Sequence, residues 1–184
     1  SDATSASPVV CGEEVIFTNA AGRVVCFDGE GRVRWERVYT PAFDGPFNKQ
    51  FEPVVVEDGA RHVFVHMEPL VPEGDDASPA RSEDEGALHG RWHHLVGLDA
   101  ATGTELWRSE DGLTQYNAPT VVGGGAPRML HARGGPHAVP ERPVGVTLTR
   151  LDGADAGQRS WRYEDPRGNH EASLQTMAHD AHHA

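Results

Sequence analysis

The feature that most restricts the fold of this chain is a unit of four short strands that occurs three times. In each unit, one strand follows a proline and a second follows a glycine or acidic turn. A third strand ends in a hydrophobic residue and an aspartate, and a fourth carries a tryptophan. The units run from Pro8 to Trp35, from Pro53 to Trp107 and from Pro119 to Trp161. Four strands repeated over about 40 to 50 residues are typical of β-propeller blades.

The units differ in length because of insertions between their second and third strands. In the second unit the insertion covers roughly residues 68–91, and in the third roughly 132–142. We therefore expect an all-β chain with antiparallel blades at residues 7–40, 51–112 and 117–165. Residues 171–184 contain a further strand pattern and are expected to begin a fourth blade.

Each unit repeats residue types that have a defined local role. An aspartate side chain accepts backbone N–H bonds in the turn that follows it, and glycine allows the left-handed conformation of a tight hairpin. The predicted turn residues are Asp28 and Gly31, Asp99 and Gly103, and Asp152 and Gly153. Tryptophan has a large flat ring that can be buried between neighbouring blades. The predicted blade-docking residues are Trp35, Trp107 and Trp161.

Residues 98–107, with the sequence Leu-Asp-Ala-Ala-Thr-Gly-Thr-Glu-Leu-Trp, resemble the repeat of the pyrroloquinoline-quinone-like, or quinoprotein alcohol dehydrogenase-like, β-propeller family. Residues 27–35 resemble a version one residue shorter, and residues 151–161 a looser version. The resemblance implies a ring of seven or eight blades, and propellers in general have about 4 to 8. We therefore expect the chain to be part of a larger ring, whose remaining blades are its partners. Closure by oligomerisation is the alternative.

The resemblance leaves two functions open. The family contains quinone-dependent alcohol and sugar dehydrogenases, and also propellers without a quinone, including an outer-membrane assembly scaffold. The enzymes carry an adjacent cysteine pair, calcium ligands and a catalytic aspartate, none of which has a match in this sequence. We predict a non-catalytic periplasmic or extracellular module for ligand binding or protein assembly, with no cofactor. The alternative is a fragment of a quinone-dependent dehydrogenase, which would use pyrroloquinoline quinone and calcium.

Amide and aromatic residues are concentrated in the segments that precede the second, third and fourth units. Connections between blades lie at one rim of a propeller, so these side chains are expected to converge near the central axis and to bind a carbohydrate or a protein. Alternatively, the aromatic side chains fill the junctions between blades. The predicted surface comprises Asn48, Gln50, Gln115, Tyr116, Asn117, Asn169 and His170.

The formal net charge of −12 disfavours nucleic acid as a partner. The chain also lacks the run of about 20 apolar residues that a membrane-spanning helix needs. The acidic segment at residues 73–85 lacks the regular spacing of a known calcium loop, so it is interpreted as a solvated loop. Histidines at 93–94 and 179–183 match no position of the repeat, so no metal site is predicted there.

The two cysteines, Cys11 and Cys26, are expected on strands that flank a third strand. Such strands are about 10 Å apart, which is too far for a disulfide. Both cysteines are therefore predicted to be buried thiols.

Overall fold

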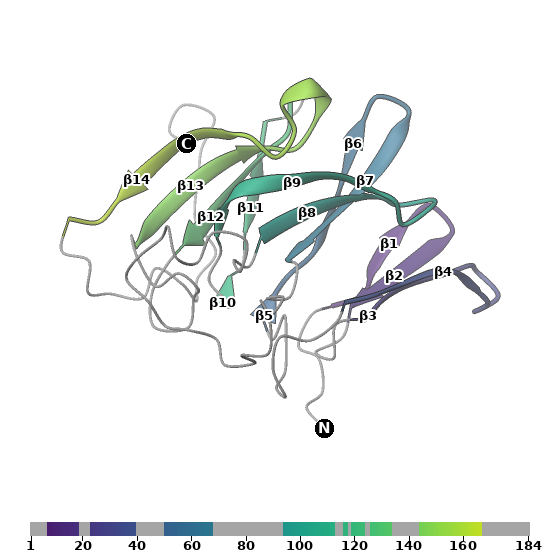
Figure 1. Ribbon diagram of the computed structural model, residues 1–184. Coiled ribbons are helices and arrows are strands. Elements are labelled where there is room, and N and C mark those ends of the chain that lie inside the picture. The colour runs from purple at the N-terminus through teal and green to yellow at the C-terminus, as the bar shows by residue number, and fades with distance from the viewer. Residues whose placement is uncertain are drawn as a thin grey trace.

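The computed structural model contains three four-stranded antiparallel sheets that follow one another as β-propeller blades (Figure 1). The structure describes residues 7–18, 23–39, 50–67, 94–112, 116–117, 119–123, 126–133 and 144–166. Within these ranges the regular elements are strands and one 3-10 turn, η2 (Gly153–Asp155). In this part of the chain, no helix has the length and apolar character that spanning a membrane requires. The predicted all-β blade architecture is confirmed.

In each sheet, strands that are consecutive in the chain are also neighbours in the sheet. The first sheet contains β1 (Val9–Cys11), β2 (Glu14–Thr18), β3 (Arg23–Phe27) and β4 (Val33–Val38). The second contains β6 (Val54–Asp58), β7 (Arg61–Met67), β8 (His94–Asp99) and β9 (Glu105–Gly112). The third contains β11 (Thr120–Val122), β12 (Arg128–Arg133), β13 (Gly145–Arg150) and β14 (Arg159–Glu164). Two short strands outside these sheets, β5 (Gln50–Phe51) and β10 (Tyr116–Asn117), form a parallel pair.

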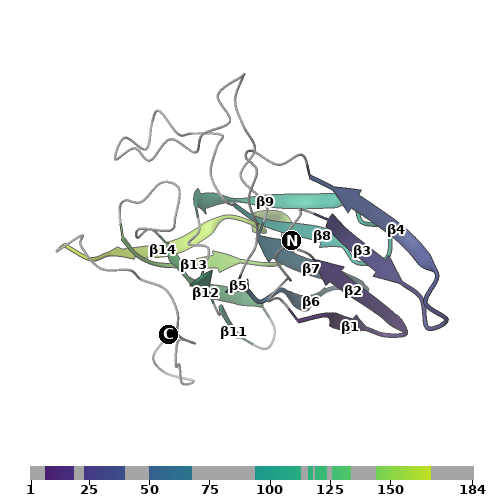
Figure 2. The same ribbon diagram turned by 90° about the horizontal axis from the view of Figure 1, so that it is seen from below.

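The three sheets are arranged in the same orientation. Their first strands, β1, β6 and β11, lie along one side of the molecule, and their last strands, β4, β9 and β14, lie along the other (Figure 2). This is the arrangement of blades around a common axis. The predicted fourth-blade segment at residues 171–184 lies outside the described residues.

All three sheets have an irregularity at the same place in the last strand pair. The register shifts between Cys26 and Phe27, between Gly97 and Leu98, and between Leu148 and Thr149. Immediately beyond the shift, Trp35 pairs with Cys26, Trp107 with Gly97 and Trp161 with Leu148. A β-bulge redirects the side chains next to it. The shared register therefore places the three tryptophans at one equivalent position of the blade.

The hydrophobic core lies between successive sheets. One cluster joins Ile16 and Cys26 of the first sheet to Phe64 and Leu98 of the second. A second cluster joins Val63, Val65 and Met67 of the second sheet to Met129 and Leu151 of the third. Strand β7 contributes to both clusters, so the middle sheet is covered on its two faces. That burial explains the nearly continuous apolar sequence of β7.

Both cysteines are buried free thiols, as predicted. Burial is the main reason that the pKa of the Cys26 thiol is raised to about 11, and the nearby Glu14 carboxylate raises it further. The pKa of Cys11 is raised for the same two reasons. Because the thiolate is the reactive form, both side chains are poor nucleophiles at neutral pH.

Candidate functional site

Trp35 links the first sheet to the second. Its indole Nε1–H donates a hydrogen bond of 2.9 Å to the carbonyl oxygen of Ala100, in the β8–β9 turn. The ring also lies against Gly103 of that turn, where a methyl group would be 2.6 Å from a ring carbon. Gly103 has a φ of +72°, so glycine is favoured there by conformation as well as by space. Trp35 therefore covers a turn of the following blade.

Trp107 has the corresponding contact with the third sheet. Its ring lies between Gly97, its own cross-strand partner, and Gly157 of the third sheet. A methyl group at Gly157 would be 3.1 Å from the ring and 2.5 Å from the carbonyl oxygen of Arg108. Unlike Trp35, however, Trp107 has a buried indole N–H with no hydrogen-bond partner within the described residues.

The first two predicted turns have the expected hydrogen bonds. The Asp28 carboxylate accepts backbone N–H bonds from Glu30 and Arg32, at 3.0 and 2.9 Å. The Asp99 carboxylate accepts them from Ala101 and Thr102, at 2.9 and 3.1 Å. Each turn is closed by its predicted glycine. The N–H of Gly31 bonds the Asp28 carbonyl at 2.9 Å, and the N–H of Gly103 bonds the Asp99 carbonyl at 2.8 Å.

The third turn differs from the prediction based on Asp152 and Gly153. Its closing bond runs from the N–H of Gly157 to the carbonyl of Arg150, at 2.8 Å. Asp152 makes no side-chain capping bond, and Gly153, with a φ of +66°, begins η2. The structural counterparts of Asp99 and Gly103 are therefore Arg150 and Gly157. The difference arises because the third turn is longer and contains η2.

Polar contacts accompany the tryptophan between the first two sheets. Arg37, two residues after Trp35, forms an ion pair of 2.7 Å with Glu105, two residues before Trp107. Next to it, the Tyr39 hydroxyl lies 3.0 Å from Nε2 of His66. These long-range pairs were not predicted, because nothing in the sequence near either partner identifies them.

The Tyr39–His66 pair is buried. Desolvation lowers the pKa of His66 to about 3 and raises that of Tyr39 to about 12, so both side chains are neutral at pH 7. Nδ1 of His66 is 3.0 Å from the carbonyl of Met67, which can only accept a hydrogen bond. Nδ1 therefore carries the proton, and Nε2 accepts the Tyr39 O–H. The pair satisfies its own polar groups and leaves none directed at a substrate.

The face of the first sheet opposite Trp35 is partly apolar and exposed. The cross-strand pairs Val10–Val15, Val15–Phe27 and Phe27–Val33 place these side chains on one face. Val38 shares that face through its pairing with Arg23. We call this the leading face.

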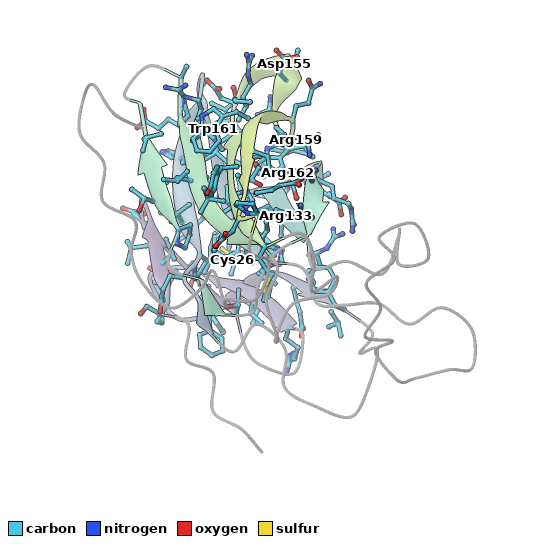
Figure 3. All side chains as sticks on the ribbon, turned by 90° about the vertical axis from the view of Figure 1, so that its left-hand side faces the viewer. Cys26, Arg133, Asp155, Arg159, Trp161 and Arg162 are labelled. Atoms are coloured by element: carbon cyan, nitrogen blue, oxygen red, sulfur yellow. The ribbon has the colours of Figure 1, made fainter. Side chains whose placement is uncertain are left out.

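The third sheet has a corresponding face directed away from the second sheet. Trp161 pairs with Leu148, and Tyr163 pairs with Val146. Leu148 and Val146 pack with Val122 and Leu130 of the same sheet. We call this the trailing face, and Figure 3, seen from the side of β14, labels Trp161 on it.

All the large hydrophobic side chains that are exposed among the described residues lie on the leading or trailing face. The exposed fractions are 68% for Val10, 57% for Val33, 65% for Val38, 36% for Trp161 and 57% for Tyr163. At the equivalent position inside the stack, Trp35 and Trp107 are packed against the following sheet. The apolar surface is thus concentrated at the two ends of the stack.

A hollow of about 440 Å³ lies near the turns of the first two sheets. Its lining includes Glu14, Asp58, Arg61, His62 and Asp99. Two of its carboxylates accept hydrogen bonds from backbone turns. Asp99 accepts the N–H of Ala101 in the β8–β9 turn, and Asp58 accepts the N–H of Gly153 at 3.2 Å. Within the described ranges, no group of three or more His, Cys, Asp or Glu side chains is arranged to bind a metal.

The structure places two segments of the predicted ligand surface side by side. Gln50 and Tyr116 are partners in the parallel β5–β10 ladder, and Phe51 pairs with Asn117. Asn48, Gln115, Asn169 and His170 lie outside the described residues, as do the acidic segment at 73–85 and the histidines at 179–183. The segments that precede the second and third units are therefore close to each other, as their backbone pairing shows.

The repeated sheets and their shared register identify the fold. The chain is part of a β-propeller. No family model matches it, and no curated protein matches it. Among solved structures it is similar to BamB from Moraxella catarrhalis, with 14% identity, a TM-score of 0.43, and 88% of this chain and 52% of that chain covered. It is also similar to a europium-containing methanol dehydrogenase, with 15% identity and a TM-score of 0.49. That match covers 89% of this chain and 25% of the dehydrogenase chain. The chain thus spans about half the length of the first and a quarter of the second.

Proposed function

We propose that this chain is a non-catalytic propeller module that acts by binding other proteins, in the cell envelope. The observation that carries the proposal is the location of every large exposed hydrophobic side chain of the described residues on the leading or trailing face. Exposed apolar side chains that gather on one face of a sheet can mark a site of protein association. The envelope location rests on the resemblance of the repeat to the quinoprotein-like family.

Trp161 gives the trailing face its aromatic character. Trp35 and Trp107 act as docking residues, because each places a large ring against a glycine turn of the next sheet. Trp161 has the same register but is partly exposed. It is therefore an aromatic anchor for a protein partner, the residue type most enriched in the energetic centres of interfaces.

The β5–β10 pair provides a second candidate surface, for a carbohydrate. Gln50, Tyr116 and Asn117 belong to adjacent strands, and amide and aromatic groups suit hydrogen bonding to and stacking on a sugar. A glycan array probed with the labelled chain tests this part. Binding that survives Tyr116→Ala and Asn117→Ala would contradict it.

The competing function is quinone-dependent oxidation. The cysteines are not adjacent: they lie on β1 and β3, both buried, so they do not form the vicinal pair of the quinone enzymes. The test adds pyrroloquinoline quinone and calcium to the purified chain. Quinone absorbance and dye-linked oxidation of alcohols and sugars are then measured, with a quinone dehydrogenase as the positive control. We expect no spectral change and no turnover, whereas turnover would overturn the proposal.

Partner binding is tested by site-specific photo-crosslinking. A photoreactive residue at Tyr163 or Val33 should capture a defined set of envelope proteins. The same residue at exposed Ala126, on the β11–β12 turn, should not. Equal capture at all three positions would indicate that the end faces have no special role.

A further inference from the structure

The hollow near the turns of the first two sheets is walled by two adjacent blades of this chain. The β1–β2 hairpin supplies one wall, and the β6–β7 hairpin and the β8–β9 turn supply the other (Figure 1). Further blades would stack on the leading or trailing face, so they would not form its walls.

Glu14 and His62 approach the hollow from opposite walls. In β2, Glu14 lies on the same side of the strand as Ile16. In β7, His62 lies on the same side as Phe64. Ile16 and Phe64 both belong to the core between these two sheets, so Glu14 and His62 are directed toward the same junction. Both residues line the hollow.

Among the described residues, the Glu14 carboxylate has no hydrogen-bond donor, unlike the other carboxylates of the hollow. Asp58 and Asp99 accept backbone N–H bonds at 3.2 and 2.9 Å. The ion-pair partner of Glu14 is Arg34, whose Nε is 3.9 Å from Oε1, beyond hydrogen-bond distance. The Glu14 side chain is only 22% exposed. A carboxylate that is largely removed from water is stabilised by a donor or a cation, and the hollow has space for one.

The charges of the lining favour a cation. Three carboxylates line the hollow, against the one guanidinium of Arg61. The neutral form of the His62 ring adds one acceptor nitrogen. Within the described part of the chain, no three His, Cys, Asp or Glu side chains are arranged to bind a metal ion. An organic cation has no such requirement, because it supplies its own donors to a carboxylate.

The remaining lining favours a ligand with a short alkyl chain. These residues are small and mostly apolar: Cys11, Gly12, Ala60, Ala100 and Ala101. The backbone carbonyls of His62 and Ala100 already accept hydrogen bonds, from the N–H of Ala100 and the indole of Trp35. This part of the wall therefore offers packing contacts. The volume of about 440 Å³ lies in the range of about 300–1,000 Å³ that is usual for small-molecule sites.

We propose that this hollow binds an ammonium or guanidinium group carried on a short alkyl chain. The cation donates hydrogen bonds to the Glu14 carboxylate and to the His62 ring, and the alkyl chain packs on Ala100 and Ala101. Free amines have this chemistry, and so do the lysine and arginine side chains of proteins. The site is separate from the leading and trailing faces, so it goes beyond the proposed function.

Nuclear magnetic resonance of the 184-residue chain, with labelled backbone amides, tests the site. The probes are butylammonium and agmatine, added at constant ionic strength. We expect saturable shifts centred on the amides of Ala60, Ala100 and Ala101, with a dissociation constant of about 1 mM or lower. Butyrate, an anion with the same number of carbon atoms, should give no saturable shift. Failure of both cations to bind saturably overturns the proposal.

Glu14→Gln should raise the dissociation constant at least about tenfold, because it removes the charge of the acceptor. Glu13→Gln is the matched control, since it removes the same charge from the next residue, which is exposed and outside the lining. It should leave binding unchanged. Equal weakening by the two variants would show only a general electrostatic attraction and would overturn the site.

A steric pair tests the site without changing its charge. Ala101→Trp adds a large ring to the lining and should weaken binding at least about tenfold, whereas Ala126→Trp, at an exposed turn, should not. Circular dichroism and melting curves establish that each variant is folded, and this pair decides the outcome if Glu14→Gln does not fold. Unchanged binding by Ala101→Trp would place the ligand elsewhere.

The source of the cation is tested with a blocked pentapeptide that has one central lysine. Binding tighter than that of butylammonium would indicate a side chain of a protein partner. Binding of the free amines alone would indicate a small molecule. Either result, if Glu14→Gln abolishes it, supports the cation site.

Discussion

Trp35 and Ala100 are 65 residues apart, yet the indole N–H of one bonds the carbonyl of the other across the junction of two blades. The equivalent Trp107 has a buried N–H without a partner among the described residues. The two positions therefore separate the contribution of the hydrogen bond from that of the packed, half-buried ring.

Trp35→Phe should destabilise the chain more than Trp107→Phe. Both changes remove the same part of an indole ring, but only the first leaves a buried carbonyl without its donor. An unmade bond of this kind costs about 1–3 kcal/mol. The difference in unfolding free energy between the two variants, measured with urea, should fall in that range. Equal losses of unfolding free energy in the two variants would mean that the Trp35–Ala100 hydrogen bond makes no net contribution to stability.

Gly103→Ala should be much more damaging than Gly59→Ala. Both glycines have a positive φ, +72° and +64°, so each substitution incurs the strain of a left-handed alanine, about 1–2 kcal/mol. Only the methyl group at Gly103 collides with Trp35, while the one at Gly59 has open space. Overpacking adds about 1–3 kcal/mol. Thermal melting of the two variants measures the added cost, and similar melting temperatures would rule out a tight Trp35 contact.

The sequence predicted the blades because their signals are local. A turn aspartate, a glycine three or four residues later and a tryptophan in the next strand each specify a few residues of backbone. For Asp28 and Asp99 the structure contains the hydrogen bonds that these residue types favour. Alternating burial and the shared bulge then follow from strand pairing.

The third turn was predicted in part: Gly153 has the expected positive φ, +66°, but Asp152 does not cap the turn, because two local signals compete there. Asp152-Gly153 has the composition of a tight turn, but strands β13 and β14 pair through Arg150 and Gln158, whose backbone bond is 2.9 Å. The extra residues form η2. Cross-strand register decides the outcome, and it brings Gly157 against Trp107 of the neighbouring sheet, a contact that no local pattern contains.

The sequence indicated that the blades pack on one another through tryptophan, but it did not indicate which residues the tryptophans contact. The tryptophan ring indicated a surface to be buried, but not the glycine it would meet. The Tyr39–His66 pair and the Arg37–Glu105 ion pair join residues far apart in the chain. Conversely, the segments of Gln50 and Tyr116 occupy the same place in successive units, and their backbones pair in the β5–β10 ladder.

Trp107→Ala should destabilise the chain by about 3 kcal/mol or more, because the half-buried ring packs against Gly97 and Gly157 and loss of a large packed aromatic side chain is costly. Trp161→Ala is the matched control at the equivalent position of the third sheet. Residue Trp161 is 36% exposed, so the loss of its side chain should cost far less. Urea unfolding at low micromolar concentration measures both. If Trp107→Ala barely changed the midpoint, its ring would not hold the second and third sheets together.

The chain should lose stability as the pH falls from about 6.5 toward 3, in part through His66. The pKa of His66 is lowered to about 3 by burial, whereas in the unfolded chain it has its ordinary value of 6.5. Between these values the unfolded state binds a proton that the folded state does not. Stability therefore rises with pH in this window, by at most about 1.4 kcal/mol per unit for one group.

His66→Gln keeps an acceptor for Tyr39 and a donor for Met67 but cannot titrate, so the unfolding free energy of this variant should depend less steeply on pH. His62→Gln, which removes an exposed histidine of the same strand, is the control. Equal slopes for His66→Gln and the original chain would show that His66 is already charged in the folded protein, and the buried Tyr39–His66 bond would have to be reassigned.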